Sequence, residues 1–297
     1  MDCKVYPLSP TEDITLQKFI AENLEKGYIC QSKSPYAFPF FFIKKKNGNL
    51  QPVQDYWRLN AFTVHNTAPL LLIRELMDRL TRVHGRRSVL FTKLDICWGY
   101  NNIHMRDGDQ WKAVFKTNRS LFESMVMFFG LTNTPATFQS MMNHLFRELI
   151  DEGYVMIYMD DILIHTPNDP MLHRRVVNDV LHILAVNDLY LKPQKCQFEQ
   201  TEVEYLGVII SEDSIAMDPI KIQGVKNWKR PTTLKEVWAF LGFLNFYHMY
   251  ICGFSMLAAP LNALIAHCAK GGKFYWNDEL EAAFNTLVDA VCTAPVL

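Results

Sequence analysis

Residues 155–164 read VMIYMDDILI, a run in which apolar and aromatic residues surround two adjacent carboxylates, Asp160 and Asp161. Two neighbouring carboxylates repel each other, and burying even one of them without a partner is costly. The flanks, Val155–Met159 and Ile162–Ile164, have the composition of two short strands and predict a β-hairpin with the acids at its tip. A solvated turn would explain this backbone, but two carboxylates on rigid strands are also a good platform for a divalent metal ion.

Bulk composition permits a large core and gives a weak indication that the chain binds a polyanion. The chain has 297 residues, 49% of them hydrophobic and 21% charged, with a formal net charge of −1. This size suits one elongated, multi-lobed unit or two to three subdomains. Two basic segments without acids, 33–54 and 219–235, flank the acidic hairpin. They are either solvated faces or the two ends of a grip on a polyanion.

The cysteines and the hydropathy pattern indicate an intracellular protein. The seven cysteines are an odd, dispersed set without zinc-site spacing, which is typical of a reducing compartment: they are residues 3, 30, 97, 196, 252, 268 and 292. No signal peptide is evident and no apolar run is long enough to span a bilayer, so neither secretion nor a membrane partner is expected. A cytoplasmic particle and the nucleus both stay open.

Local signals predict an α+β fold with a central antiparallel sheet, helices behind it and a helical C-terminal part. Ser9–Glu12 and Thr233–Glu236 have the pattern of capping boxes that open helices. Helices are also expected over 70–80, from Thr134 and over 171–187, and strands over 38–43, 89–96, 113–129 and 203–210, with a hairpin turn at 46–49.

A third carboxylate, Asp95, ends the β-type run FTKLD. If this strand lies in the same sheet as the hairpin, Asp95 converges with Asp160 and Asp161 on one edge. Such a trio suits two Mg²⁺ ions about 3.5–4 Å apart, which would clamp the attacking and leaving oxygens of a phosphoryl transfer. Taken alone, Asp95 would more simply cap the following turn.

Specific motifs in a fixed order then give a family resemblance over nearly the whole chain. They are KSPYAFPFFFIKKKNG (33–48), FTKLDICWGYNNI (91–103), FFGLTNTPATFQ (128–139), YMDDILI (158–164), LYLKPQKCQF (189–198), EYLGVIIS (204–211), FLGFLNFY (240–247) and APVL (294–297). In these motifs the sequence resembles the reverse transcriptases of gypsy-type LTR retrotransposons.

The resemblance implies a right-hand polymerase whose antiparallel palm sheet bears the catalytic carboxylates. The expected partition is fingers at 1–80 and 107–140, palm at 81–106 and 141–212, and thumb with the start of the connection at 213–297. No protease motif is found, and the chain stops about where an RNase H domain would begin. We therefore expect a polymerase module without protease, RNase H or integrase domains.

The implied activity is RNA-directed DNA polymerisation, in which a dNTP is transferred to a primer 3′-hydroxyl. Asp95, Asp160 and Asp161 would be the catalytic residues and the ligands of two Mg²⁺ ions, with Mn²⁺ as an alternative. The expected partners are an RNA template, a DNA or RNA primer, the RNA–DNA hybrid and dNTPs, with the oligomeric state open.

Other motif positions take roles by the same resemblance. Tyr100 resembles the steric gate that rejects a ribonucleotide 2′-hydroxyl, and Gln139 and Lys45 resemble contacts to the incoming dNTP. Either Lys192 or Lys195 would protonate the pyrophosphate. The primer grip would be Tyr205, Leu206 and Gly207, and the basic segment 219–235 with the helix after it would hold the hybrid by its phosphates.

The sequence departs from the family pattern mainly at positions that usually carry arginine: Cys30, Gln51, Trp57, Cys97, His104, His248 and Cys252. Gln51 matters most, because a neutral amide gives no charge-assisted contact to a triphosphate. Losing such a contact costs on the order of 2–4 kcal/mol in the transition state, or about 30- to 1000-fold in rate.

These residues are the ones reached from CGN arginine codons by a single C-to-T change on one strand or the other, and Ser120 replaces a usual glycine in the same manner. Our hypothesis is decay of this copy by cytosine deamination, leaving a weak or dead remnant that at most binds nucleic acid. The competing reading is neutral drift within an active lineage. An RNA-templated RNA polymerase is disfavoured by Tyr100.

Overall fold

The computed structural model describes residues 3–44, 48–67, 89–212, 214–248 and 251–292. The chain divides into two compact units. One contains the described residues within Met1–Val83 and Thr92–Phe198, and the other contains those within His84–Phe91 and Glu199–Leu297. The expected partition into fingers, palm and thumb stays a prediction.

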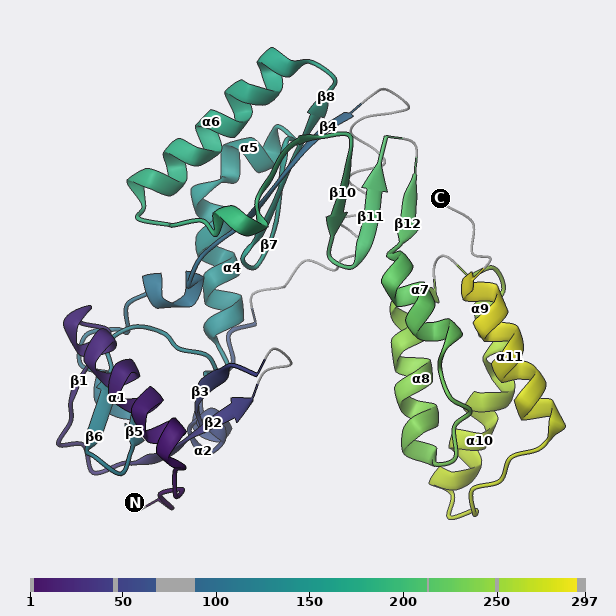
Figure 1. Cartoon of the computed structure of the whole chain (residues 1–297), viewed down its shortest axis with the longest axis horizontal. Helices are drawn as coiled ribbons and strands as arrows, with labels where there is room; N and C mark the ends of the chain where they lie inside the picture. The colour runs from purple at the N-terminus through teal and green to yellow at the C-terminus, as the bar shows by residue number, and fades with distance from the viewer. Residues whose placement is uncertain (1–2, 45–47, 68–88, 213, 249–250, 293–297) are drawn as a thin grey trace. The chain divides into compact units, whose positions relative to one another are not determined.

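The first unit begins with a helix packed on a five-stranded sheet (Figure 1). The Ser9 capping box opens α1, where the Ser9 hydroxyl accepts from the Glu12 amide and the Glu12 carboxylate accepts from the Ser9 amide. The sheet order is β1-β6-β5-β2-β3. The bounds are α1 (Pro10–Glu25), β1 (Ile29–Gln31), β2 (Phe38–Lys44), β3 (Leu50–Gln54), α2 (Trp57–Phe62), η2 (Gln110–Lys112), β5 (Val114–Lys116) and β6 (Leu121–Ser124).

A four-stranded sheet of order β7-β8-β4-β9 carries the acidic hairpin. One buried apolar cluster joins β4, β7 and β8 to α4, α5 and α6, so these helices cover the sheet (Figure 1). The bounds are β4 (Val89–Asp95), η1 (Gly99–Asn102), α4 (Thr134–Leu145), α5 (Arg147–Asp151), β7 (Val155–Tyr158), β8 (Asp161–Pro167), α6 (Pro170–Val186), η3 (Pro193–Lys195) and β9 (Gln197–Gln200).

In its described residues, the second unit combines a three-stranded sheet of order β10-β11-β12 with the helices α7 to α11 (Figure 1). Phe240 and Phe284 meet at its core with ring centroids 4.7 Å apart. The bounds are β10 (Glu202–Tyr205), β11 (Val208–Ser211), β12 (Ile215–Met217), α7 (Pro219–Lys226), α8 (Leu234–Phe246), α9 (Phe254–Leu257), α10 (Ala259–Ala269) and α11 (Asp278–Cys292).

The expected α+β class is confirmed, with two local differences. The sheet of the first unit is mixed, because β2 pairs parallel with β5 through Phe38↔Phe115. At α8 the Thr233 hydroxyl accepts from the Glu236 amide as predicted, but the Glu236 carboxylate accepts from Thr232 instead of completing the box. The helix predicted over 70–80 lies outside the described residues.

The remaining global expectations concern thiols and membranes. All seven cysteines are free thiols. No helix within the described ranges combines the length and the apolar character needed to cross a bilayer.

A buried histidine joins three elements behind the hairpin. The His173 side chain on α6 is fully buried, and its two ring nitrogens lie 2.7 Å from the Thr92 hydroxyl on β4 and 2.8 Å from the Thr166 hydroxyl on β8. Both threonines are also fully buried. Because buried polar groups are stable only when hydrogen-bonded, this imidazole fixes α6 to the strand that ends at Asp95 and to the strand that begins at Asp161.

We predict that His173→Leu lowers the free energy of unfolding by roughly 2–4 kcal/mol, because two buried hydroxyls lose their imidazole partner. Urea denaturation monitored by circular dichroism measures the loss. His182→Leu is the matched control: it lies on the same helix but is exposed, and its change should stay within about 0.5 kcal/mol. Equal effects of the two substitutions would contradict the assigned role of His173.

Candidate active site

The acidic pair sits at the tip of a tight hairpin. Tyr158 pairs with Asp161 across β7 and β8, so Met159 and Asp160 alone form the connection. Met159 has φ 58°, a left-handed conformation that L-residues with a bulky side chain adopt at a cost of about 1–2 kcal/mol. Asp160 is exposed at the tip and Asp161 is half-buried at the start of β8.

Asp95 reaches the same tip through the backbone. Its strand, β4, neighbours β8 in the sheet, and the Ile96 amide donates to the Asp160 carbonyl at 2.9 Å. Asp95 as a whole residue is 7% exposed. The condition for the expected convergence, that the FTKLD strand lies in the same sheet as the hairpin, is therefore met.

Two lysines bind the two oxygens of Asp95. The Lys192 ammonium lies 2.5 Å from Oδ1, and the Lys195 ammonium lies 2.8 Å from Oδ2. Burial alone would raise the pKa of Asp95, but these hydrogen bonds outweigh it and hold the pKa below its usual value. The same contact, with its charge, raises the pKa of Lys195.

At Asp161 the effects that raise the pKa outweigh those that lower it. Its burial raises its pKa most, and the charges of Asp160 and Asp95 add to this rise, while Lys93 and Lys195 oppose it without cancelling it. Burial is therefore the main cause of the raised pKa of Asp161, and the neighbouring carboxylates add to it. Lys93, on β4, is a neighbour that the sequence motifs did not single out.

The donor set has the chemistry that Mg²⁺ prefers, since all three side chains offer hard carboxylate oxygens. The ammonium groups of Lys192 and Lys195 neutralise the Asp95 carboxylate, as a bound metal ion would. Within the described part of the chain, no three His, Cys, Asp or Glu side chains are already grouped so that they could hold a metal ion. The residues therefore fit a metal ion by chemistry and charge, in a site where Asp95 is paired with lysine.

Gln139 on α4 holds the hairpin backbone. Its side-chain oxygen accepts from the Met159 amide at 2.7 Å, and its side-chain nitrogen donates to the Ile157 carbonyl at 3.0 Å and to Asn143 Oδ1 at 2.9 Å. The Gln139 side chain is 2% exposed. Its expected contact to a nucleotide stays a prediction, and the structure gives it a positioning role that sequence reasoning missed.

Tyr100 borders the acidic tip. Its ring packs edge-on against Phe129 at 4.9 Å and Phe138 at 5.4 Å between centroids. Burial, with the nearby charge of Asp160, raises the pKa of its hydroxyl to about 12, so the group is neutral at physiological pH. The preceding residue must be glycine, since a Cβ at Gly99 would lie 2.6 Å from the Phe138 ring.

The remaining predicted positions are Lys45 and the expected primer grip. Lys45 lies outside the described residues. Tyr205, Leu206 and Gly207 belong to the second unit, where Leu206 and Gly207 form a left-handed turn and the Tyr247 hydroxyl donates to the Gly207 carbonyl at 3.3 Å. The expected primer grip stays a prediction.

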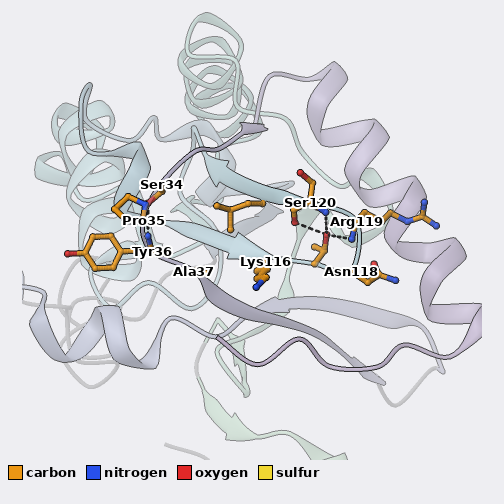
Figure 2. Close-up of a pocket in the computed structure, with 10 residues that line it drawn as sticks. Ser34, Pro35, Tyr36, Ala37, Lys116, Asn118, Arg119 and Ser120 are labelled. Carbon is orange, nitrogen blue, oxygen red and sulfur yellow. Dashed lines mark hydrogen bonds between the residues drawn. The ribbon is translucent and has the colours of Figure 1, made fainter. Parts of the chain in front are cut away.

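A pocket of about 470 Å³ lies elsewhere in the first unit, between residues 34–37 and the turn at 116–121. Figure 2 shows Tyr36 and Arg119 at opposite ends of it. Arg119 is paired with Asp13 at 2.6 Å, so its charge is already compensated. None of the three carboxylates lines this pocket.

Comparison with known sequences gives one family. A family model described as reverse transcriptase (RNA-dependent DNA polymerase) matches residues 43–210. The Tf2-3 and Tf2-7 transposon polyproteins of Schizosaccharomyces pombe are each 36% identical to the chain over 292 residues. The matches cover 98% of this chain and 21% of each polyprotein.

Comparison with solved structures gives the same fold. A foamy viral protease-reverse transcriptase in complex with double-stranded DNA is similar at a TM-score of 0.87 and 22% identity, over 99% of this chain and 50% of that one. A foamy viral protease-reverse transcriptase in complex with an RNA/DNA hybrid is similar at a TM-score of 0.82 and 22% identity, over 98% of this chain and 38% of that one.

We predict opposite effects on stability for two neighbouring carboxylates near pH ~7 without divalent metal. Asp95→Asn should cost about 2 kcal/mol, because two charge-assisted hydrogen bonds are weakened. Asp161→Asn should add about 0.5–1 kcal/mol, because an ionised, crowded carboxylate is removed. Urea denaturation of both variants in the presence of EDTA measures the two changes.

The pH dependence follows from the directions of the two shifts. The raised pKa of Asp161 means that its ionised form costs stability, so the Asp161→Asn gain disappears as the pH falls through that raised pKa. The lowered pKa of Asp95 means that its contribution is lost only as the pH falls through the lowered value. The same sign for both variants would contradict this charge balance.

We predict that Gln139→Leu lowers stability by roughly 2–4 kcal/mol, since the Met159 amide and the Ile157 carbonyl lose their partner. Asn143→Ala is the matched control, because it removes one contact of the same glutamine and leaves both hairpin contacts in place. Its cost should be about 1 kcal/mol or less. Protection of the Met159 amide from hydrogen exchange should fall in Gln139→Leu and not in Asn143→Ala. Unchanged protection in Gln139→Leu would contradict the role of Gln139 in holding the hairpin backbone.

Proposed function

Because the chain belongs to the reverse transcriptase family, we propose that it is the polymerase region of an LTR retrotransposon polyprotein and acts inside the cell as an RNA-directed DNA polymerase. The proposal is supported above all by one observation: Asp95 meets the Asp160–Asp161 hairpin within the family match. The substrates would be dNTPs, a DNA or RNA primer and an RNA template.

Asp95, Asp160 and Asp161 would hold two Mg²⁺ ions, with Mn²⁺ as an alternative. When bound, these ions would activate the primer 3′-hydroxyl and neutralise charge on the leaving pyrophosphate. The support is the donor chemistry and the raised pKa of Asp161, which burial causes with the charges of Asp160 and Asp95. The ammonium of Lys192 or of Lys195 would donate a proton to the pyrophosphate, since both lie against Asp95.

Tyr100 would exclude ribonucleotides. Its ring is held by Phe129 and Phe138, so the phenol cannot easily swing aside for a 2′-hydroxyl. Its neutral hydroxyl beside Asp160 is compatible with a wall of the nucleotide site. This favours dNTPs over NTPs and opposes the reading as an RNA polymerase.

Nucleic acid would be held by both units. The solved relatives are complexes with double-stranded DNA and with RNA/DNA hybrid, and we propose the same partners here. In the second unit, Tyr205, Leu206 and Gly207 would grip the primer. The basic segment 219–235 and the exposed face of α8 would hold the backbone phosphates.

A second function is favoured by the substituted arginines, namely a remnant that binds nucleic acid without catalysis. Cys30 lies directly opposite Glu123 across β1 and β6, where a basic side chain would form a cross-strand ion pair. The thiol instead makes a weak contact to the Glu123 carboxylate at 3.5 Å. Gln51 on β3 likewise offers no charge to a triphosphate.

We predict that the chain extends a DNA primer on an RNA template with Mg²⁺ and dNTPs, and that Asp160→Asn abolishes this extension. Gln51→Arg should raise kcat/KM by about 30- to 1000-fold if the lost arginine is a triphosphate ligand. Parallel reactions with NTPs test Tyr100. If the wild-type chain does not extend the primer and Gln51→Arg does, this copy has decayed but has kept an intact scaffold. If no folded variant extends the primer, the result would favour the non-catalytic remnant.

A further inference from the structure

The two lysines on Asp95 are held very differently. The Lys192 side chain is 27% exposed, and its ammonium also donates to the Ile96 carbonyl at 3.1 Å. Its own backbone amide donates to the Asp95 carbonyl at 2.9 Å, next to the β-bridge between Ile96 and Leu191. Lys192 is therefore part of the pairing that fixes β4.

Lys195 has no such anchor. Its side chain is 58% exposed, and among the described residues its ammonium hydrogen-bonds to Asp95 Oδ2 alone. A lysine ammonium is a compact charge on a flexible four-carbon stem, so an exposed one exchanges partners readily. Lys195 can leave Asp95 without breaking any other hydrogen bond of its ammonium within the described residues.

The buried carboxylate of Asp95 is stabilised by the cations that pair with it. Asp95 is 7% exposed, and a buried carboxylate with an uncompensated oxygen is costly. Any ion that binds Asp95 Oδ2 must first replace the ammonium that occupies it. This competition lowers the apparent affinity for that ion, because binding must also displace the lysine.

We propose that Lys195 is an exchangeable counter-ion for Asp95: its ammonium neutralises Oδ2 in the metal-free protein and leaves when a divalent cation binds, while Lys192 stays in place. The inference rests on the metal-binding role proposed for Asp95. Once released, the ammonium lies beside the acidic tip and is free to pair with an anionic group such as a triphosphate. A triphosphate would then strengthen cation binding, and by linkage the cation would strengthen triphosphate binding.

The test is Mn²⁺ binding to the full chain without nucleotide, measured by the loss of the free-ion electron paramagnetic resonance signal. Lys195→Gln should bind Mn²⁺ roughly three- to tenfold more tightly than wild type, as expected for removal of a partly exposed ion pair. Lys195→Arg keeps a charged donor and should stay near wild type. A purely structural role for Lys195 would not produce a gain of affinity.

Two controls distinguish direct displacement of Lys195 from a through-space effect of its charge, and test whether Asp95 is a metal ligand. In roughly 1 M KCl, where the Debye length is about 3 Å, a through-space effect of the lost charge is screened, whereas direct displacement persists. A gain that vanishes in this salt, or no gain in Lys195→Gln, overturns the inference. Asp95→Asn tests the premise: Mn²⁺ binding that is unaffected by this variant means that Asp95 is not a ligand, and the proposed metal role itself fails.

Discussion

Repulsion among carboxylates at the ends of buried strands is the constraint to which the surrounding structure is fitted. Asp95, Asp160 and Asp161 are brought together by the sheet, and the apolar side chains packed behind them provide no compensating charge. Lysines provide it instead, and they do so unequally. Asp95 is paired with two lysines and has a lowered pKa, while burial and the neighbouring carboxylates raise the pKa of Asp161. This difference between the two carboxylates is the observation on which the proposed metal site rests.

The hairpin tip is held in place by polar contacts from outside the hairpin. Gln139 bonds the backbone on both sides of the tip, and His173 ties the strands to α6. Both side chains are buried, so their hydrogen bonds are shielded from water. Such contacts allow Met159 to keep a left-handed conformation that a free hairpin would relax. Rigid placement of this kind is what phosphoryl transfer requires of a protein, because the catalysis consists mainly of positioning and charge neutralisation.

The positions where the resemblance predicts arginine and the residues of the acidic site follow different patterns. The three carboxylates, Lys192, Lys195 and Gln139 are all present, while the sequence has Cys, Gln, Trp or His where arginine is expected. Cys30 shows the consequence in one cross-strand pair, where Glu123 faces a thiol. A mutational process that acts on CG codons would produce this division, because Asp and Lys codons do not offer it the same target.

The sequence by itself determined the hairpin, the capped helix α1, the strand ending in Asp95 and the family, because these depend on short-range periodicity, turn chemistry and ordered motifs. It did not determine which distant residues hydrogen-bond to each other. Gln139 is one polar residue among many on α4, and nothing local marks it as the partner of a backbone 20 residues away. Lys192 and Lys195 are equivalent in the motif, and only the approach of β4 makes one an anchor and leaves the other exposed. Those differences are decided by tertiary contacts, since burial and hydrogen-bond geometry do not exist until distant strands pack together.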